Sequence, residues 1–259
     1  MGQWLSQEKR PPSDVVIFHH PGRGPWTPSM IPFAVKLETY FRMTKISYQG
    51  KYGLTPCPGT GKFPWIEYNG TVLGDSSMII KYLNKKFDID LNKDLTPEQR
   101  AIARAMQKMI EEHLYWVGVS LRWNHYFDLS LMTRAMGMPY RLVTWFISRK
   151  MTKYAWAQGM GRHSLEEMLE IMHDDLQAIS DFMGDKPFLM GEKATEVDCA
   201  VFGMLSQVRW NMPGLGEEGV RLVEDRYPRI CAYCDRMKAT YWPDWDECIT
   251  FDGTRIPTK

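Results

Sequence analysis

The spacing of apolar residues near the start of the chain predicts a strand, a helix and a second strand. A continuous apolar run over residues 15–18 is typical of a buried strand. A helix from about residue 29 or 31 to residue 44 follows, with an apolar face formed at four-residue spacing by Phe33, Leu37 and Phe41. A second short strand is expected over residues 46–48. Residues 1–13 are polar and are expected to form a flexible leader.

The clearest local signal is a β-hairpin. Residues 65–68 and 71–73 are β-prone, and the Asn69-Gly70 pair between them suits a two-residue type I′ turn. Pro64 begins the first of these strands, where a missing N–H is tolerated, so we expect a cis peptide bond between Phe63 and Pro64. Such a bond would leave the Phe63 backbone free to pair with an extended ligand.

A helix is expected directly after the hairpin. Asp75 or Ser76 is its predicted N-cap, and apolar residues follow at helical spacing. Free N–H groups at a helix start attract carboxylates. The full order, β-α-β followed by β-β-α, is the thioredoxin topology, in which a right-handed crossover makes the first two strands parallel. The start of the first helix should then face the Phe63-Pro64 corner.

From about residue 95 onward the pattern is helical. Thr96 and Gln99 form a capping box, and the residue pairs Ser164/Glu167 and Thr195/Asp198 repeat that arrangement. Helices are expected over residues 101–126, 140–154, 164–183, 196–208 and 227–239. We therefore expect an α/β domain over residues 14–90, an all-α domain over residues 95–245 and a tail over residues 246–259.

Composition agrees with a compact protein of two domains. The chain has 259 residues, 44% of them hydrophobic, which is enough for a sizeable core. Its 32 basic and 31 acidic residues give a net charge of +1, which disfavours nucleic acid and favours small or neutral partners. Five cysteines without disulfide-like spacing indicate a reducing compartment, so a cytoplasmic location is expected.

The first six residues carry a lipidation signal. Met1 to Ser6 match the pattern for N-myristoylation of Gly2, although six-residue patterns also arise by chance. A single acyl chain anchors a protein only marginally. No stretch approaches the roughly 18 to 20 apolar residues of a membrane span. The alternative to a purely cytoplasmic protein is therefore peripheral membrane contact through an acylated Gly2.

The two halves together resemble a cytosolic glutathione transferase over about residues 14–245. The motifs that carry this resemblance are Pro64 and Asp75-Ser76 in the first half and Thr195-x-x-Asp198 in the second. Residues 28–43, 61–69 and 198–203 further resemble the failed axon connections family, which is related to the metaxins. The resemblance implies a thioredoxin-like domain followed by an all-helical transferase C-terminal-like domain. Family members are associated with axon development or, in nematode relatives, cadmium response.

The resemblance also implies a binding site for glutathione, as ligand or as co-substrate. Transferases hold this tripeptide by main-chain pairing beside the cis proline and by an acidic residue and a serine at its γ-glutamyl end. Four residues match those positions: Phe63, Pro64, Asp75 and Ser76.

Catalysis by a transferase requires a hydroxyl or a cysteine at the start of the first helix. The alignment places Ile31 at this position, and isoleucine can neither donate a hydrogen bond nor attack. Ser29 and Thr27 are the candidate catalytic hydroxyls, although hydroxyls at helix starts usually serve as caps.

Other chemically interesting residues are assigned simpler roles. Cys231 and Cys234 lie inside a predicted helix and are expected in the core. Cys57, in a loop rich in Pro and Gly, is the thiol expected to be exposed. His19 and His20 end a strand but lack the partners that metal binding requires, so no metal site is predicted.

Three functions follow as alternatives. The first, which we favour, is a protein that binds glutathione or a related thiol peptide, catalyses weakly or not at all, and acts as a scaffold or in signalling. The second is an active transferase that uses Thr27 or Ser29 to conjugate hydrophobic electrophiles. The third is a metaxin-like membrane-associated adaptor. Transferases are commonly dimeric, so a homodimer is also considered.

Overall fold

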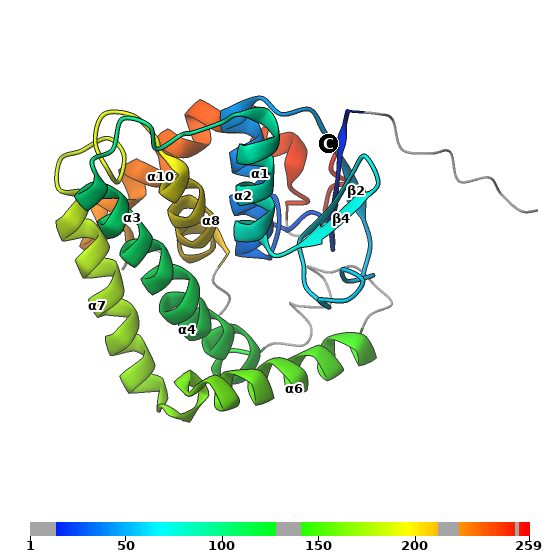
Figure 1. Ribbon diagram of the computed structural model, residues 1–259. Coiled ribbons are helices and arrows are strands. Elements are labelled where there is room, and N and C mark those ends of the chain that lie inside the picture. The colour runs from blue at the N-terminus through cyan, green and yellow to red at the C-terminus, as the bar shows by residue number, and fades with distance from the viewer. Residues whose placement is uncertain (1–13, 128–140, 212–222, 252–253) are drawn as a thin grey trace, which may run out of the picture.

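A four-stranded sheet occupies one side of the molecule, and helices form the rest (Figure 1). The computed structural model describes residues 14–127, 141–211, 223–251 and 254–259. Strand β1 (Val16–His20) pairs in parallel with β2 (Tyr48–Tyr52) and antiparallel with β3 (Trp65–Tyr68), which pairs antiparallel with β4 (Thr71–Gly74). The strand order β2-β1-β3-β4 confirms the predicted thioredoxin topology.

The hairpin is confirmed, whereas the predicted position of the second strand is wrong. Asn69 and Gly70 both have positive φ, 45° and 81°, as a type I′ turn requires. The second strand covers residues 48–52 instead of 46–48. Ile46 is buried, and its N–H bonds to the Phe41 carbonyl as the preceding helix ends. The actual β2 is an edge strand with mostly exposed residues, so it lacks the apolar pattern that would have revealed it.

Helices α1 (Pro32–Thr44) and α2 (Ser76–Phe87) lie side by side between the sheet and the helical half (Figure 1). Helix α2 is capped by Asp75, as predicted. Helix α1 is unusual because most of its residues are buried, including the charged side chains of Lys36 and Glu38. It is enclosed on the sheet side and on the helical side at once.

The helical half confirms all five predicted helices, with boundaries that differ by a few residues. Its described elements are α3 (Pro97–Met109), the π-turn η1 (Ile110–Leu114), α4 (Tyr115–Ser120), the π-turn η2 (Leu121–His125), α6 (Arg141–Gln158), η3 (Met160–Arg162), α7 (Leu165–Met183), α8 (Glu196–Trp210), α10 (Pro228–Tyr241) and η4 (Trp245–Cys248). The three predicted capping boxes are formed. The first predicted helix, over residues 101–126, is one continuous run of turns interrupted twice by π-helical geometry.

The two halves meet where α1 crosses α8. A Cβ atom at Gly203 would lie 2.6 Å from the Pro32 carbonyl oxygen, so only glycine allows the helices to approach this closely. Val35 of α1 belongs to the apolar core of the helical half, and Cys199 of α8 belongs to the core of the sheet half. The halves therefore share side chains rather than merely touching.

Both buried charges of α1 are paired. Lys36 Nζ lies 2.5 Å from Glu111 Oε1 in η1 and donates to Ser77 Oγ at 2.8 Å. Glu38 accepts two hydrogen bonds from Arg23, at 2.6 and 3.0 Å, and one from the Tyr48 hydroxyl at 2.9 Å. Burial opposes ionisation of Glu38, but the neighbouring arginines hold its pKa below the usual range.

The segment after α10 returns to the sheet half. Arg42 of α1 lies 2.5 Å from Asp244 and stacks on the ring of Trp242 at 3.9 Å. The Thr250 N–H bonds to the Gly24 carbonyl at 2.9 Å, and Lys259 lies 3.2 Å from Asp244. Residues 246–259, expected to be a tail, thus include an ordered segment attached to the loop that follows β1.

The Arg42–Asp244 pair leads to a prediction about stability at low pH. Partial burial opposes ionisation of Asp244, but Arg42 and Lys259 lower its pKa from 3.8 to about 2. The pair therefore stabilises the fold above pH ~4, and its contribution is lost as the pH falls toward 2. We expect Asp244→Asn to lower the free energy of unfolding by about 2 kcal/mol at neutral pH, by about half of that near pH 3 and by much less near pH 2.

Urea unfolding of both proteins across this pH range measures the effect. Asp246→Asn is the matched control, because Asp246 is exposed and forms no ion pair with a described residue. A difference between Asp244→Asn and the original protein that stays constant from pH 7 to pH 3 would contradict the assignment.

Candidate functional site

The register of the hairpin brings the four predicted binding residues together. Trp65 pairs with Gly74, so the next residues outward, Pro64 and Asp75, lie opposite each other across the two strands. The peptide bond between Phe63 and Pro64 is cis, as predicted. Phe63, Pro64, Asp75 and Ser76 thus form one corner at the edge of the sheet, which we call the hairpin corner.

Asp75 carries the negative charge of the hairpin corner. Its Oδ1 atom accepts hydrogen bonds from the N–H groups of Ser77 at 3.1 Å and Met78 at 3.3 Å. Its Oδ2 atom accepts from Lys62 Nζ at 2.9 Å. Partial burial opposes ionisation, but Lys62 and the two N–H groups hold the pKa of Asp75 below its usual range. Asp75 is therefore ionised at neutral pH.

Other polar groups of the hairpin corner are unpaired within the described structure, although Ser76 is only 5% exposed. No described residue forms a hydrogen bond with the Phe63 backbone, or with the N–H or hydroxyl of Ser76. The Phe63 backbone can pair with an extended peptide, as the edge of a sheet does. The start of α2 with the Ser76 hydroxyl suits a carboxylate, and the Asp75 carboxylate suits an ammonium group. An α-amino acid end group carries both charges.

The start of α1 lies at the same end of the sheet, because β1 runs beside β3 with His19 opposite Trp65. Ile31 is the N-cap residue of α1, forms no side-chain cap and is partly exposed. Pro32 has no N–H, and no described residue accepts a hydrogen bond from the N–H of Phe33. The position from which transferases present a reactive side chain therefore presents an aliphatic one.

The two candidate catalytic hydroxyls lie behind Ile31. Thr27 is fully buried, and its hydroxyl donates to the Ser29 carbonyl at 2.8 Å. Ser29 is 2% exposed, and its Oγ accepts the N–H of Ile31 at 3.2 Å. Both hydroxyls thus have structural hydrogen bonds that hold the loop before α1.

Arg122 of η2 was not identified from the sequence. Its guanidinium is buried and donates to the carbonyls of Met30 at 2.9 Å and Asn211 at 2.7 Å, and to Gln207 Oε1 at 3.3 Å. No described carboxylate pairs with it. Burial lowers its pKa to about 10, so it stays charged at neutral pH. An arginine in a helical pattern resembles a solvated surface residue, and only these tertiary hydrogen bonds reveal that it is buried.

Aromatic residues flank the start of α1 on the side of the helical half. The ring of Phe33 lies 4.9 Å from that of Tyr115 in α4, and Tyr115 contacts Trp116 at 5.2 Å. All three side chains are partly exposed. A hydrophobic group bound near the start of α1 would contact this surface.

His19 and His20 have structural partners. His19 stacks on Trp65, with ring centres 3.5 Å apart, and its Nε2 lies 2.6 Å from Glu67. His20 is fully buried against Phe18, and burial lowers its pKa to about 4, so it is neutral at pH 7. In the described part of the chain, no group of three or more His, Cys, Asp or Glu residues is arranged to hold a metal ion.

The expectation that Cys57 is exposed is wrong, because it is only 3% exposed. The loop after β2 folds back over the hairpin: Cys57 Sγ donates to the Pro58 carbonyl, and a Cβ atom added at Gly74 would come within 2.9 Å of that sulfur. Cys231 and Cys234 lie in the helical core, as predicted, and burial raises the pKa of both thiols. All five cysteines are free and buried.

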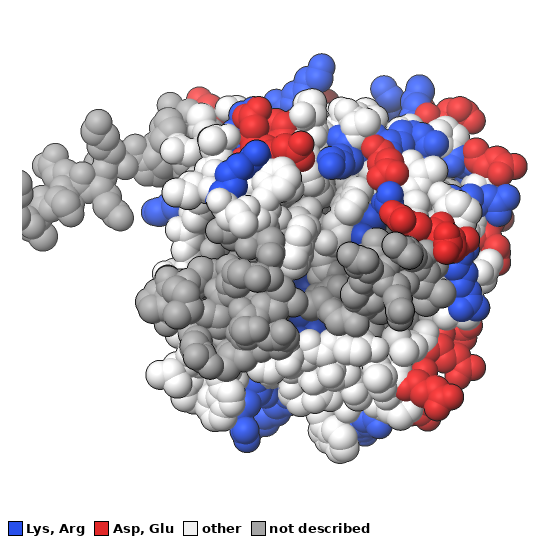
Figure 2. Space-filling model, turned by 180° about the vertical axis from the view of Figure 1, so that it is seen from behind, with Lys and Arg blue, Asp and Glu red and all other residues white. Residues whose placement is uncertain are grey.

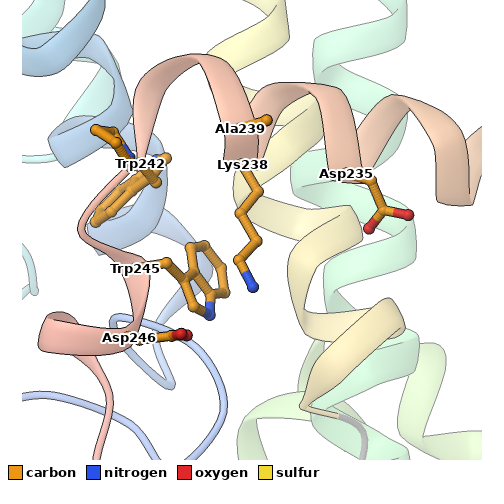
Figure 3. A pocket seen from close by; sticks show the side chains of 7 residues that line it. Asp235, Lys238, Ala239, Trp242, Trp245 and Asp246 are labelled. Carbon is orange, nitrogen blue, oxygen red and sulfur yellow. The ribbon is translucent and has the colours of Figure 1, made fainter.

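A shallow hollow of about 230 Å³ lies elsewhere, on α10 and the turn after it (Figure 3). Its wall includes Trp242, Trp245 and Lys238, and the Lys238 ammonium lies 5.1 Å from the Trp245 ring. It shares no residue with the hairpin corner. Gly2, the candidate lipidation site, lies outside the described residues.

Comparison with protein families supports the architecture. Residues 32–127 match the model of the glutathione S-transferase N-terminal domain, and residues 172–237 match that of the glutathione S-transferase C-terminal domain. Among solved structures, a Bombyx mori glutathione transferase superposes with a TM-score of 0.58 at 16% identity and covers 93% of this chain and 94% of its own. A rice transferase in complex with glutathione gives a TM-score of 0.54 at 16% identity, covering 88% and 90%.

Three curated relatives define the family. Failed axon connections of Drosophila melanogaster is 30% identical to this protein over 92% of its chain. The matched part covers only 60% of the length of that relative. Isoprene-epoxide glutathione S-transferase of Rhodococcus is 32% identical over 83% of this chain and 94% of its own. Metaxin-2 of Mus musculus is 25% identical over 72% of each chain. The chain therefore belongs to the glutathione S-transferase-like family that includes the failed axon connections protein and is related to the metaxins.

Proposed function

We propose that this protein binds glutathione, or a related thiol peptide, at the hairpin corner and catalyses weakly or not at all, acting as a scaffold or in signalling. One observation carries the proposal: the groups that would hold the peptide are assembled and free, while the start of α1 presents Ile31. In this proposal binding and reaction depend on different elements, and the start of α1 lacks the reactive group.

The charges of the hairpin corner suit the γ-glutamyl end of glutathione. Asp75 would accept hydrogen bonds from the ligand's ammonium group, and Ser76 with the start of α2 would donate to its carboxylate. The Lys62–Asp75 ion pair is largely exposed, with 59% and 37% of the two side chains accessible. Exposed pairs contribute about 1 kcal/mol or less, so a ligand ammonium can displace Lys62.

Weak catalysis follows from the size of the remaining effects. A bound thiol near α1 would meet the helix dipole and the free N–H of Phe33. A charge at a helix terminus is stabilised by about 0.3–1 kcal/mol, which is less than the 1.36 kcal/mol that lowers a pKa by one unit. Free thiols have a pKa of about 8.5, so a shift of this size leaves most of the thiol protonated at neutral pH.

A second candidate function is active conjugation of hydrophobic electrophiles. The 32% identity to an isoprene-epoxide glutathione S-transferase over 94% of that relative favours it. The aromatic residues Phe33 and Tyr115 would contact an apolar acceptor, and Arg122 adds a positive charge close to the start of α1. In this alternative, Ser29 or Thr27 supplies the hydroxyl.

A third candidate is a membrane-associated adaptor. We propose that the protein resides in the cytoplasm, because all five cysteines are free thiols. The signal at Gly2 favours reversible membrane contact through one acyl chain. Neither the cytoplasmic location nor acylation of Gly2 requires a ligand at the hairpin corner.

Glutathione binding is tested with two substitutions in the hairpin corner. Asp75→Asn keeps an acceptor for the helix cap but removes the negative charge, and Ser76→Ala removes the free hydroxyl. Hydrogen bonds to charged groups contribute roughly 1.5–3 kcal/mol, so each variant should bind at least about ten-fold more weakly by titration calorimetry.

Ser77→Ala is the matched control for Ser76→Ala. The Ser77 hydroxyl bonds to Lys36 and Gln107, which belong to the interface between the halves. This variant should keep the glutathione affinity, and thermal unfolding checks that all three variants fold. Equal affinities in the original protein and both corner variants would refute the assigned site, and no binding at millimolar glutathione would leave the adaptor.

Because the proposal attributes weak catalysis to Ile31, a hydroxyl at this position should increase the activity. Ile31→Ser places a hydroxyl at the reactive position and should raise the rate of conjugation of a chlorodinitrobenzene-type electrophile by about ten-fold or more, since positioned proton donors contribute 10²–10⁴-fold. Ile31→Val, which adds no hydroxyl, should have no effect. Substantial activity in the original protein that falls in Ser29→Ala or Thr27→Val would establish the second candidate instead.

Acylation predicts a change in cell fractionation. Gly2→Ala removes the acceptor of the acyl chain, so the variant should move from the membrane pellet to the soluble fraction. Mass spectrometry of the N-terminal peptide measures the modification directly. Identical partitioning of both proteins, with an unmodified Gly2, would remove this proposal.

A further inference from the structure

Helix α6 is oriented with its apolar side chains toward solvent. Its inward face consists of small and polar residues: Thr144, Ser148, Thr152 and Ala155. The hydroxyls of Ser148 and Thr152 donate to the Trp123 carbonyl at 2.9 and 3.3 Å. Its outward face includes Leu142 at 75% exposure, Phe146 at 63% and Trp156 at 58%. A helix that served only to cover a core would have the reverse arrangement.

Exposed apolar residues are concentrated on this helix. Among the described residues, thirteen large hydrophobic side chains are exposed, and six belong to α6: Leu142, Val143, Trp145, Phe146, Tyr154 and Trp156. Single exposed apolar residues are normal, but a cluster marks a surface that contacts something else. We call this outward face, from Leu142 to Trp156, the α6 face.

The α6 face is also basic. The sequence has no Asp or Glu between residues 129 and 165. Arg149, Lys150 and Lys153 are exposed between the two apolar ends of the helix, and none pairs with a described acidic residue. Arg149 lies 5.0 Å from the Trp145 ring and Lys150 lies 5.5 Å from the Tyr154 ring. In a chain of net charge +1, this is a strong local excess of positive charge.

The figures show the position of this face. Helix α6 runs along the lower edge of the molecule in Figure 1, away from the hairpin and from α10. Seen from behind in Figure 2, that lower edge is blue and white, while red residues gather on the right side. This position agrees with the exposed fractions of the residues on the α6 face.

We infer that the α6 face docks onto an anionic lipid surface. Trp and Tyr are favoured at the boundary between headgroups and acyl chains, and Lys and Arg attract anionic headgroups. The face combines both residue types on one helix that lies flat on the molecule. Among the described residues, no helix is long and apolar enough to cross a membrane, so docking would be peripheral.

A second copy of the chain fits the same surface poorly. A two-fold dimer through the α6 face would bring the same patch of both copies together, so Arg149, Lys150 and Lys153 would face their own equivalents. Like charges across a contact oppose association. An anionic membrane places negative charge opposite these three basic residues and has no two-fold axis that would pair like charges.

Vesicle binding tests the inference with purified, unacylated full-length protein, so that Gly2 contributes nothing. The probes are vesicles of phosphatidylcholine alone and vesicles in which about a third of the lipid is phosphatidylserine, measured by co-sedimentation. The original protein should bind the anionic vesicles at least about ten-fold more strongly, and added salt should weaken that binding.

Two double variants separate the contributions. Lys150→Glu with Lys153→Glu reverses the charge, and Trp145→Ser with Phe146→Ser removes the apolar contact; each should lower binding about ten-fold or more. Lys85→Glu with Lys86→Glu is the control, because it changes the net charge equally at an exposed site on α2. Glutathione affinity should be unchanged in all of them, which separates this inference from the proposed function.

Three outcomes would overturn the inference. The first is equal binding to both kinds of vesicle. The second is equal loss of binding in the control and in the α6 charge variant, which would indicate a nonspecific effect of net charge. The third is self-association of the original protein in light scattering that disappears in Trp145→Ser with Phe146→Ser, which would make a second copy the occupant.

Discussion

The burial of two opposite charges on one helix is the constraint around which both halves of this protein are organised. Lys36 and Glu38 lie on α1, which is enclosed on almost every side. Lys36 is paired with Glu111 from the helical half, and Glu38 with Arg23 from the loop after β1. Removing one partner of a buried pair costs about 3–5 kcal/mol, a large share of the stability of a typical domain. Separating the two halves would break the Lys36–Glu111 pair and leave one unpaired charge on each half, whereas the Glu38–Arg23 pair lies within the sheet half.

The candidate site is built from both halves of the molecule. The groups proposed to bind the peptide belong to the hairpin, whose register places Pro64 opposite Asp75. The start of α1 is held from the other side, because Arg122 bonds to the Met30 carbonyl and Gln207 bonds to the Ser29 carbonyl at 3.0 Å. In the proposed function, affinity for a thiol peptide and reactivity toward an electrophile would thus be set by different parts of the chain. A family with this arrangement can keep one property while it loses the other.

Local signals in the sequence predicted the parts of the fold that local forces decide. The Asn69-Gly70 turn and the cap at Asp75 depend on neighbouring residues, and the structure has both. Tertiary packing decides the other parts of the fold, and for these the predictions from the sequence were wrong or absent. An edge strand without apolar alternation was misplaced, and a loop cysteine expected to be exposed was covered by its own loop. The burial of Arg122 and the outward apolar face of α6 depend on which neighbour each helix meets, which periodicity cannot indicate.

The two π-turns between α3 and the end of η2 act as one-residue insertions in an otherwise regular helix. Each extra residue rotates everything that follows by about 100° around the helix axis. Glu111 lies within the first of them, and Tyr115 follows directly after it. The π geometry therefore lets one helix direct a carboxylate toward Lys36 and, a turn later, an aromatic ring toward Phe33. Gain or loss of a single residue between Glu111 and Tyr115 would rotate the Tyr115 ring away from Phe33 while leaving the buried Lys36–Glu111 pair in place.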